Sequence, residues 1–138
     1  MNILVVDDAD DIRLLLRYAL TPFGFSISEA ASGVEALSFL EARPALPDAV
    51  VLDIQMPMMD GLQTLRAIRG SRRTSALPVV LCSVKSRDVD LEEGWRVGCD
   101  GYVTKPFDVE QLVDEIHAAI DRRRRLQGNG GPSLDPSR

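Results

Sequence analysis

The sequence predicts an α/β fold in which a five-stranded parallel sheet is doubly wound, with helices on both faces. Two observations support this prediction. Five short apolar runs alternate along the chain with segments whose apolar residues recur at helical spacing. Such alternation is typical of parallel sheets, whose crossover connections are right-handed helices. The chain has 138 residues, 45% of them hydrophobic and 27% charged, which suits one soluble domain with a single core.

The first half of the chain accounts for three of the strands. Residues 3–6 form a brief, continuous, β-branched run, as a strand buried on both faces does. The next apolar residues follow the i, i+3, i+4, i+7, i+8 pattern of a helix: Ile12, Leu15, Leu16, Ala19 and Leu20. Residues 25–29 alternate in polarity, which is typical of a half-buried strand. A second helix is expected from Gly33 until Pro44 ends it, and a third strand at 49–52.

The second half continues the alternation. A third helix is expected to end near Gly70, and the fourth strand covers 78–82. The fourth helix is the least regular and is closed by Gly98, and a short fifth strand covers 101–104. The last helix has clean spacing through Val109, Leu112, Val113, Ile116 and Ile120.

The composition changes near the end of the chain. We expect one domain over residues 1–125 and a disordered tail or linker stub over residues 126–138, which are rich in Gly, Pro and Ser. The run 122–125 consists of four arginines and is expected to be the solvated end of a helix. The formal net charge of the whole chain is −5. Because the end of the chain is basic, the residues before it, here called the body, carry the acidic excess. An acidic body argues against nucleic acid as a direct partner and is compatible with cation binding.

Several classes of protein are disfavoured. The apolar runs are too short to span a membrane, and two aspartates interrupt the N-terminus before a signal peptide could form. Cys82 and Cys99 match neither a disulfide framework nor a zinc pattern. We therefore expect a cytoplasmic protein with no membrane partner.

Polar residues stand where the predicted strands end. Asp7 and Asp8 follow the first strand, Asp53 follows the third, Ser83 follows the fourth and Lys105 follows the fifth. In open parallel sheets, ligands bind beyond the carboxyl ends of the strands, where the strand order reverses. We expect these side chains to meet in one crevice. The second strand should lie at the edge of the sheet and contribute little.

This set of side chains suits one kind of chemistry. Carboxylates that converge repel one another unless a cation joins them, and all-oxygen ligands favour Mg²⁺, which also binds phosphate oxygens. An ionised carboxylate can act as a nucleophile and form an acyl phosphate, helped by a metal ion and a lysine. Each aspartate could instead cap a helix, although Asp10 or Asp11 fits that role better.

The segments LVVDDADD, VVLDIQMPMMDGL, VLCS and GYVTKPF resemble the receiver domain of two-component response regulators. The resemblance covers residues 1–121, with every expected segment in order. It implies the (βα)5 flavodoxin-like receiver fold with strand order 2-1-3-4-5. It also implies a signalling switch that takes a phosphoryl group from the phosphohistidine of a histidine kinase in a Mg²⁺-dependent reaction. Such a domain catalyses its own phosphorylation and dephosphorylation, but it does not turn over an external substrate.

The resemblance implies a role for each residue in the crevice. Asp53 matches the phosphoacceptor, Asp8 the direct metal ligand and Asp7 its partner, often acting through water. Gln55 stands where the family binds the metal through a backbone carbonyl, so its side chain should matter little for that bond. Lys105 matches a lysine that contacts the phosphoryl group.

The resemblance also implies how the switch responds. Ser83 matches the hydroxyl that pairs with the phosphoryl oxygen, and Tyr102 matches the aromatic residue whose rotamer follows it. The surface of the fourth helix, fifth strand and fifth helix would then change. Pro106 matches a position whose preceding peptide bond, here with Lys105, is usually cis. Val84 departs from the smaller residue that most of the family has after the hydroxyl, and it could narrow access to Asp53.

Other functions and partners stay open at this point. The chain could pass its phosphoryl group to a histidine phosphotransfer protein, or act as a phosphorylation-independent interaction module, although such modules usually lack an acid or the lysine. The expected partners are a histidine kinase or histidine phosphotransfer protein and a downstream protein target. We expect a monomer or a weak phosphorylation-dependent dimer, because Gly101 replaces an acidic residue often found in receivers that dimerise.

Overall fold

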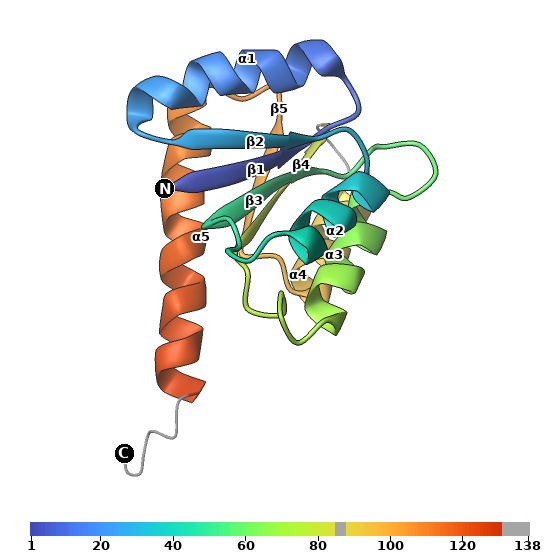
Figure 1. The fold of residues 1–138 in the computed structure, drawn as a ribbon, viewed down its shortest axis with the longest axis vertical. Helices are drawn as coiled ribbons and strands as arrows, with labels where there is room; N and C mark the ends of the chain where they lie inside the picture. The colour runs from blue at the N-terminus through green and yellow to red at the C-terminus, as the bar shows by residue number, and fades with distance from the viewer. Residues whose placement is uncertain (85–87, 131–138) are drawn as a thin grey trace.

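The structure is a computed structural model that describes residues 1–84 and 88–130. Five parallel strands form one sheet in the order β2-β1-β3-β4-β5 (Figure 1). This arrangement confirms the predicted fold class and strand order. The strands are β1 (Asn2–Val6), β2 (Ser26–Ala30), β3 (Ala49–Asp53), β4 (Val79–Val84) and β5 (Gly101–Lys105). The helices are α1 (Asp10–Leu20), a 3₁₀ turn (Thr21–Phe23), α2 (Gly33–Ala42), α3 (Gly61–Gly70), α4 (Asp88–Val97) and α5 (Val109–Gly130).

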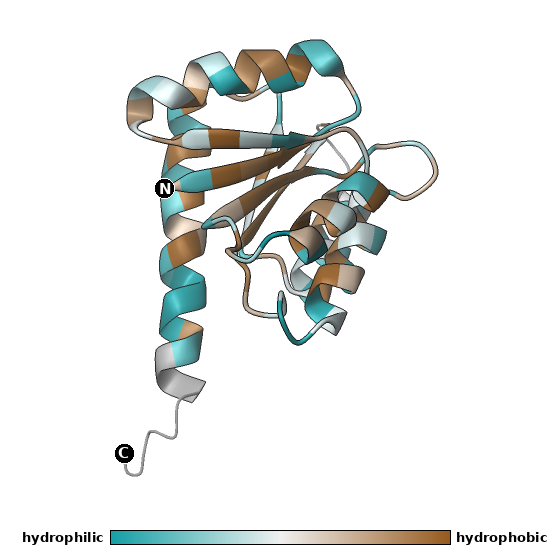
Figure 2. Ribbon diagram, in the orientation of Figure 1, coloured by the Kyte–Doolittle hydropathy of each residue, from teal (hydrophilic) through white to brown (hydrophobic). Residues whose placement is uncertain are grey.

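Helices cover both faces of the sheet and bury two apolar clusters. Helices α1 and α5 pack on one face, and α2, α3 and α4 pack on the other (Figure 1). Because successive side chains of a strand point to opposite faces, Val5 enters the first cluster and Leu4 enters the second. Figure 2 shows the resulting pattern: β1 and β3 are mostly hydrophobic, whereas β2 alternates in polarity and the helices are striped. This explains why the inner strands β1 and β3 were recognisable as apolar runs and the edge strand β2 as an alternating one.

Several element boundaries differ from the predicted ones. Strand β4 extends through Val84 and β5 through Lys105, so Ser83 and Lys105 lie within the last residues of their strands. Helix α4 begins at Asp88, before its first apolar residues. Helix α1 begins at Asp10, and its N-cap residue is Ala9, with no side-chain cap; the expected capping role of Asp10 or Asp11 was wrong.

The last helix is longer than expected. Helix α5 continues to Gly130, so residues 126–130 are helical where we expected a disordered tail. Residues 131–138 lie outside the described part of the chain, and the domain boundary at residue 125 stays a prediction. No helix among the described residues is long and apolar enough to cross a membrane.

Part of the arginine run anchors α5 to the sheet, contrary to the expectation of a purely solvated helix end. Asp100, just before β5, has a side chain that is only 2% exposed. Its carboxylate pairs with Arg69 of α3 at 2.7 Å and with Arg123 of α5 at 2.8 Å. It also accepts a hydrogen bond from the backbone N–H of Val79 at 2.9 Å. Asp100 thus ties α3, β4 and α5 together at the amino ends of β4 and β5.

We predict that Asp100→Asn lowers the free energy of unfolding by about 3 kcal/mol, because it leaves two largely buried guanidinium groups without their anionic partner. Urea denaturation measures the change. The matched control is Arg96→Gln, which removes an ion pair with Glu93 in which the arginine side chain is 74% exposed. The control should change stability by less than about 0.5 kcal/mol. Equal losses in both variants would contradict the structural role of Asp100.

Candidate functional site

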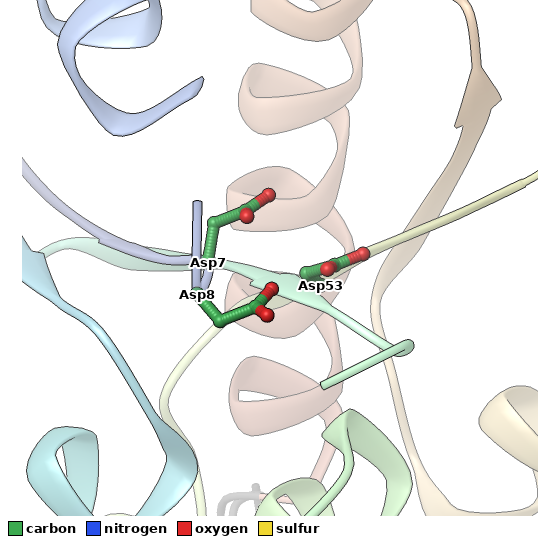
Figure 3. A group of neighbouring side chains, drawn as sticks. All are labelled: Asp7, Asp8 and Asp53. Carbon is green, nitrogen blue, oxygen red and sulfur yellow. The ribbon is translucent and has the colours of Figure 1, made fainter. Parts of the chain in front are cut away.

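Three carboxylates meet at the carboxyl end of the sheet. Asp7 and Asp8 follow β1, and Asp53 is the last residue of β3. One oxygen from each carboxylate lies within 4.8 Å of the others. Figure 3 shows the three side chains grouped beside the strand ends. The crossing point between the halves of a doubly wound sheet therefore brings these acids together, as the sequence predicts.

Lys105 at the end of β5 supplies a cation to this cluster. Its Nζ lies 3.2 Å from Asp7 Oδ2 and 3.3 Å from Asp53 Oδ1. Burial lowers the pKa of Lys105, but the ion pairs with Asp53 and Asp7 outweigh burial and raise its pKa overall. The ammonium group is therefore charged at neutral pH. The peptide bond between Lys105 and Pro106 is cis, in the geometry that the resemblance implies.

Asp53 is buried, and its cationic neighbour, Lys105, does not fully offset the effect of burial on its pKa. Its side chain is 5% exposed, and its Oδ1 accepts no hydrogen bond among the described residues. Burial raises the pKa of Asp53 to about 6; Lys105 opposes this rise, and Asp7 and Asp8 add to it. A buried carboxylate with an ammonium partner and two acidic neighbours is a suitable ligand for a hard divalent cation.

The loop after β3 explains the Asp-Gly pair of the motif. Asp60 caps α3: its side chain accepts from the backbone N–H of Gln63, and the Gln63 side chain binds the backbone N–H of Asp60. Gly61 then passes close beneath Asp53, where an added Cβ would lie 2.3 Å from the Asp53 carbonyl oxygen. Its backbone N–H donates to the carbonyl of Ile54 at 2.9 Å. These two residues hold the backbone of Asp53 in place.

The Gln55 side chain has a role that the sequence did not reveal. Its Nε2 donates to Ser83 Oγ at 3.0 Å and to Asp90 Oδ2 at 3.2 Å. Its Oε1 accepts from the backbone N–H of Val84 at 3.3 Å. The side chain thus connects the loop after β3 with β4 and α4. Whether the Gln55 backbone carbonyl binds a metal stays a prediction.

Tyr102 lies on the other side of Ser83. It is half-buried against the apolar cluster beneath α2, α3 and α4. Burial raises the pKa of Tyr102, and a side-chain hydrogen bond with Ser83 opposes this shift. Ser83 is fully buried, accepts a hydrogen bond from Gln55 Nε2 and lies close enough to Tyr102 to affect its pKa. The structure places the two predicted switch residues in contact, and their movement stays a prediction.

The edge strand is linked to the site through α1. Glu29 in β2 pairs with Arg13 at 3.1 Å and with Arg17 at 2.7 Å, both on α1. Arg13 also donates from Nη1 to the backbone carbonyl of Asp7 at 2.6 Å. Strand β2 lies at the edge of the sheet, as expected, and it supplies none of the three converging carboxylates; its contact with the site is indirect, through Glu29 and Arg13. The sequence did contain a signal for this contact. Glu29 stands near the end of β2, and α1, which follows Asp7 and Asp8, carries the two arginines.

The comparisons agree with this geometry. Residues 3–117 match the family model described as the response regulator receiver domain. The transcriptional regulatory protein AfsQ1 of Streptomyces coelicolor is 37% identical over 124 residues, which cover 90% of this chain and 53% of that protein. The response regulator MprA of Mycobacterium tuberculosis is 36% identical over 124 residues, which cover 90% of this chain and 52% of that protein. The chain spans about half the length of these curated relatives.

Solved structures share the fold along most of their length. The chemotaxis protein CheY4 of Vibrio cholerae aligns with a TM-score of 0.78 and 28% identity over 86% of this chain and 97% of that chain. A response regulator receiver domain protein from Clostridium thermocellum aligns with a TM-score of 0.82 and 26% identity over 91% of this chain and 98% of that chain.

We predict that Gly61→Ala destabilises the protein by about 1–3 kcal/mol, because its Cβ would collide with the backbone of Asp53 and Ile54. Urea denaturation provides the test. Gly70→Ala is the matched control at the other end of α3, since an added Cβ there meets nothing within 4 Å. The control should be neutral or slightly stabilising. A neutral Gly61→Ala would mean that the loop can move away from Asp53 without loss.

The raised pKa of Asp53 predicts a pH-dependent stability. Because this pKa is about 6 in the folded protein against an ordinary value of 3.8, the folded state binds more protons than the unfolded state between these values. The free energy of unfolding therefore falls as the pH rises through this window, and the loss persists at higher pH. Asp53→Asn removes the loss, and we expect it to stabilise the protein by about 1–3 kcal/mol near neutral pH.

Urea denaturation at about pH 7.5 and about pH 4, without divalent cations, separates this effect from a general one. Asp53→Asn should stabilise the protein at the higher pH and have much less effect at the lower. The control Asp114→Asn changes an exposed carboxylate on α5 and should give similar small changes at both values. Equal stabilisation by Asp53→Asn at both pH values would contradict a raised pKa.

Proposed function

The chain belongs to the family of response regulator receiver domains, and we propose that it is a phosphorylation-activated signalling switch. In this proposal Asp53 accepts a phosphoryl group from the phosphohistidine of a histidine kinase. The observation that carries the proposal is the meeting of Asp7, Asp8 and Asp53 with Lys105 at one end of the sheet. The reaction then needs mainly positioning and charge neutralisation, and this cluster is suited to both.

The acidic cluster fits a Mg²⁺ ion. Asp8 is exposed and open to solvent, Asp7 and Asp53 are buried, and Asp53 Oδ1 accepts no hydrogen bond from residues 1–84 and 88–130. Asp7, Asp8 and Asp53 would hold the ion, with the backbone carbonyl of Gln55 as a further oxygen ligand. The bound ion would neutralise the carboxylates and the oxygens of the incoming phosphoryl group.

Asp53 is the nucleophile in this proposal. One of its carboxylate oxygens bonds to phosphorus as the bond from phosphorus to the imidazole nitrogen breaks, and the imidazole leaves with the electron pair. No separate base is needed, because Asp53 is largely ionised above its pKa of about 6. Lys105 keeps one charge beside the transferred group, since its ammonium already lies 3.3 Å from Asp53 Oδ1.

The phosphodonor has a suitable place to dock. A mostly apolar hollow of about 490 Å³ opens beside the charged cluster, and its wall includes Leu15, Val84, Lys105 and Phe107. Leu15 on α1 is 60% exposed there. An apolar segment of the kinase that seats in this hollow would bring its phosphohistidine next to Lys105. Val84 borders the same entrance, which supports the idea that its bulk affects access.

The response to phosphorylation would pass through Ser83. Phosphorylation adds nearly two negative charges at Asp53, which attract the Ser83 hydroxyl. A Ser83 that turns toward the phosphoryl group must weaken its hydrogen bonds with Gln55, and Gln55 also holds Asp90 of α4. Tyr102 contacts Ser83 from the other side. These contacts support a change of the surface formed by α4, β5 and α5.

This surface is suited to a protein target. A groove of about 500 Å³ lies between the three elements, with Leu91, Trp95 and Tyr102 beside the acidic Asp114 and Glu115. The acidic excess of the body favours protein over nucleic acid as the direct partner. Nucleic acid stays an open question for the whole protein, since AfsQ1 is named a transcriptional regulatory protein and this chain spans about half of its length.

We predict that the wild-type chain gains one phosphoryl group when it is incubated with acetyl phosphate and Mg²⁺. Intact-mass spectrometry measures the gain, which hydroxylamine should reverse because an acyl phosphate is labile to it. Asp53→Asn should abolish the gain, and a chelator should prevent it. Asp60→Asn, which changes a nearby acid but keeps a helix cap, should still be phosphorylated.

Two results would contradict the proposed function. Label that persists in Asp53→Asn would place the nucleophile elsewhere. A folded wild type that binds Mg²⁺ but takes no phosphoryl group from acetyl phosphate or from phosphohistidine donors would favour a phosphorylation-independent interaction module.

A further inference from the structure

A guanidinium group lies behind the acidic pair, and we propose that it positions the metal ligands. Arg13, held by Glu29, is a positioning residue for the turn that carries Asp7 and Asp8. It acts through the backbone of Asp7 and does not itself bind the ion. This inference rests on the Mg²⁺ site of the proposed function, and it adds two side chains that lie outside the motifs of that site.

The contact is made where the sheet ladder stops. Strand β1 ends at Val6, and the N–H of Asp7 still donates to the carbonyl of Ala30 in β2 at 3.2 Å. The carbonyl of Asp7 lies beyond the ladder and receives its hydrogen bond from Arg13 Nη1 at 2.6 Å. A charged donor makes a stronger hydrogen bond than a neutral one. Arg13 therefore takes the place of a strand neighbour at the end of β1.

Fixing this carbonyl fixes the direction of the turn. The carbonyl of Asp7 belongs to the planar peptide unit that joins Asp7 to Asp8. Its orientation therefore fixes the positions of the backbone N and Cα of Asp8. The Asp7 side chain is held separately: Oδ1 accepts from the N–H of Ala9 at 2.9 Å, and Oδ2 accepts from Lys105 at 3.2 Å. Of these contacts, the one from Arg13 acts on the peptide that joins the two proposed ligands.

Arg13 is itself firmly held. Its side chain is 12% exposed, and its Nε donates to Glu29 Oε1 at 3.1 Å. The hydrogen bond from Arg17, together with those from Arg13, lowers the pKa of Glu29, so this carboxylate is ionised at neutral pH. The planar guanidinium fork binds Glu29 through Nε, the Asp7 carbonyl through Nη1 and the carboxylate of Asp10 through Nη2. The row Arg17–Glu29–Arg13 thus connects the edge strand β2 with the metal-binding turn.

An electrostatic role and a positioning role of Arg13 predict opposite changes in Mg²⁺ affinity when Arg13 is removed. A cation close to the acidic cluster repels Mg²⁺, so on charge alone its removal would strengthen Mg²⁺ binding. If Arg13 positions the turn, its removal weakens binding instead. Loss of a residue that orients a metal ligand typically lowers metal affinity by about 10- to 100-fold. The sign of the change therefore distinguishes the two roles.

The experiment is a Mg²⁺ titration of the full 138-residue chain by isothermal calorimetry, with urea denaturation to confirm that each variant is folded. Arg13→Met, which keeps much of the side-chain bulk, should weaken Mg²⁺ binding by about 10-fold or more. Glu29→Gln should weaken it in the same direction by less, and the double variant should be no worse than Arg13→Met. The matched control Arg17→Met removes an α1 arginine that binds Glu29 but not the turn, and it should change affinity by less than about twofold.

Unchanged or tighter Mg²⁺ binding by Arg13→Met would overturn the inference while leaving the metal site intact. If Arg13→Met does not fold, Glu29→Gln decides the question by the same criterion. Asp8→Ala is the reference for loss of a direct ligand and should abolish measurable binding. A folded wild type that binds no Mg²⁺ would instead overturn the metal site of the proposed function and this inference with it.

Discussion

The structure depends on one electrostatic constraint: among the described residues, three carboxylates meet at the carboxyl end of a buried sheet, and the ammonium group of Lys105 pairs with two of them, Asp7 and Asp53. Strands β1 and β3 bring Asp7, Asp8 and Asp53 together, and β5 brings Lys105. Burial raises the pKa of Asp53 to about 6; Lys105 opposes this rise, and the negative charges of Asp7 and Asp8 add to it. The gathering of negative charge makes the site suitable for a divalent cation and, after it, for a phosphoryl group.

The opposite end of the sheet shows how different partners give a buried acid a different role. Asp100 is as buried as Asp53, but two guanidinium groups and the backbone N–H of Val79 fill its acceptor positions. Asp53 Oδ1 has the ammonium of Lys105 at 3.3 Å and accepts no hydrogen bond from the part of the chain that the structure describes. A satisfied buried carboxylate holds elements together, whereas an unsatisfied one can still bind an ion or attack phosphorus. Burial alone would not distinguish the two residues.

Periodicity and the geometry of parallel sheets made the strands and their ends predictable from the sequence. Apolar runs located the five strands, and their carboxyl ends located Asp7, Asp53 and Lys105. Contacts between side chains of different elements were not predictable in this way. The pairing of Arg13 with Glu29 requires β2 to lie beside β1 in register, and the reach of Gln55 to Ser83 depends on a rotamer. The ion pair of Arg123 with Asp100 was missed for the same reason, since the two residues are distant in the sequence.

The two unforeseen contacts differ in a way that bears on the switch. Arg13 donates a charge-assisted hydrogen bond of 2.6 Å to the backbone carbonyl of Asp7, and an ion pair with Glu29 holds Arg13 in place. Gln55 is a neutral amide whose hydrogen bonds to Ser83, Asp90 and Val84 span 3.0–3.3 Å. Its contacts with Ser83 and Val84 are neutral hydrogen bonds, and these contribute less net free energy than charge-assisted ones. New charge on Asp53 would therefore displace the contacts of Gln55 first, while the turn that holds the metal ligands stays fixed. In the proposed function the site keeps its ion while α4 is released, and this difference between its two sides suits that behaviour.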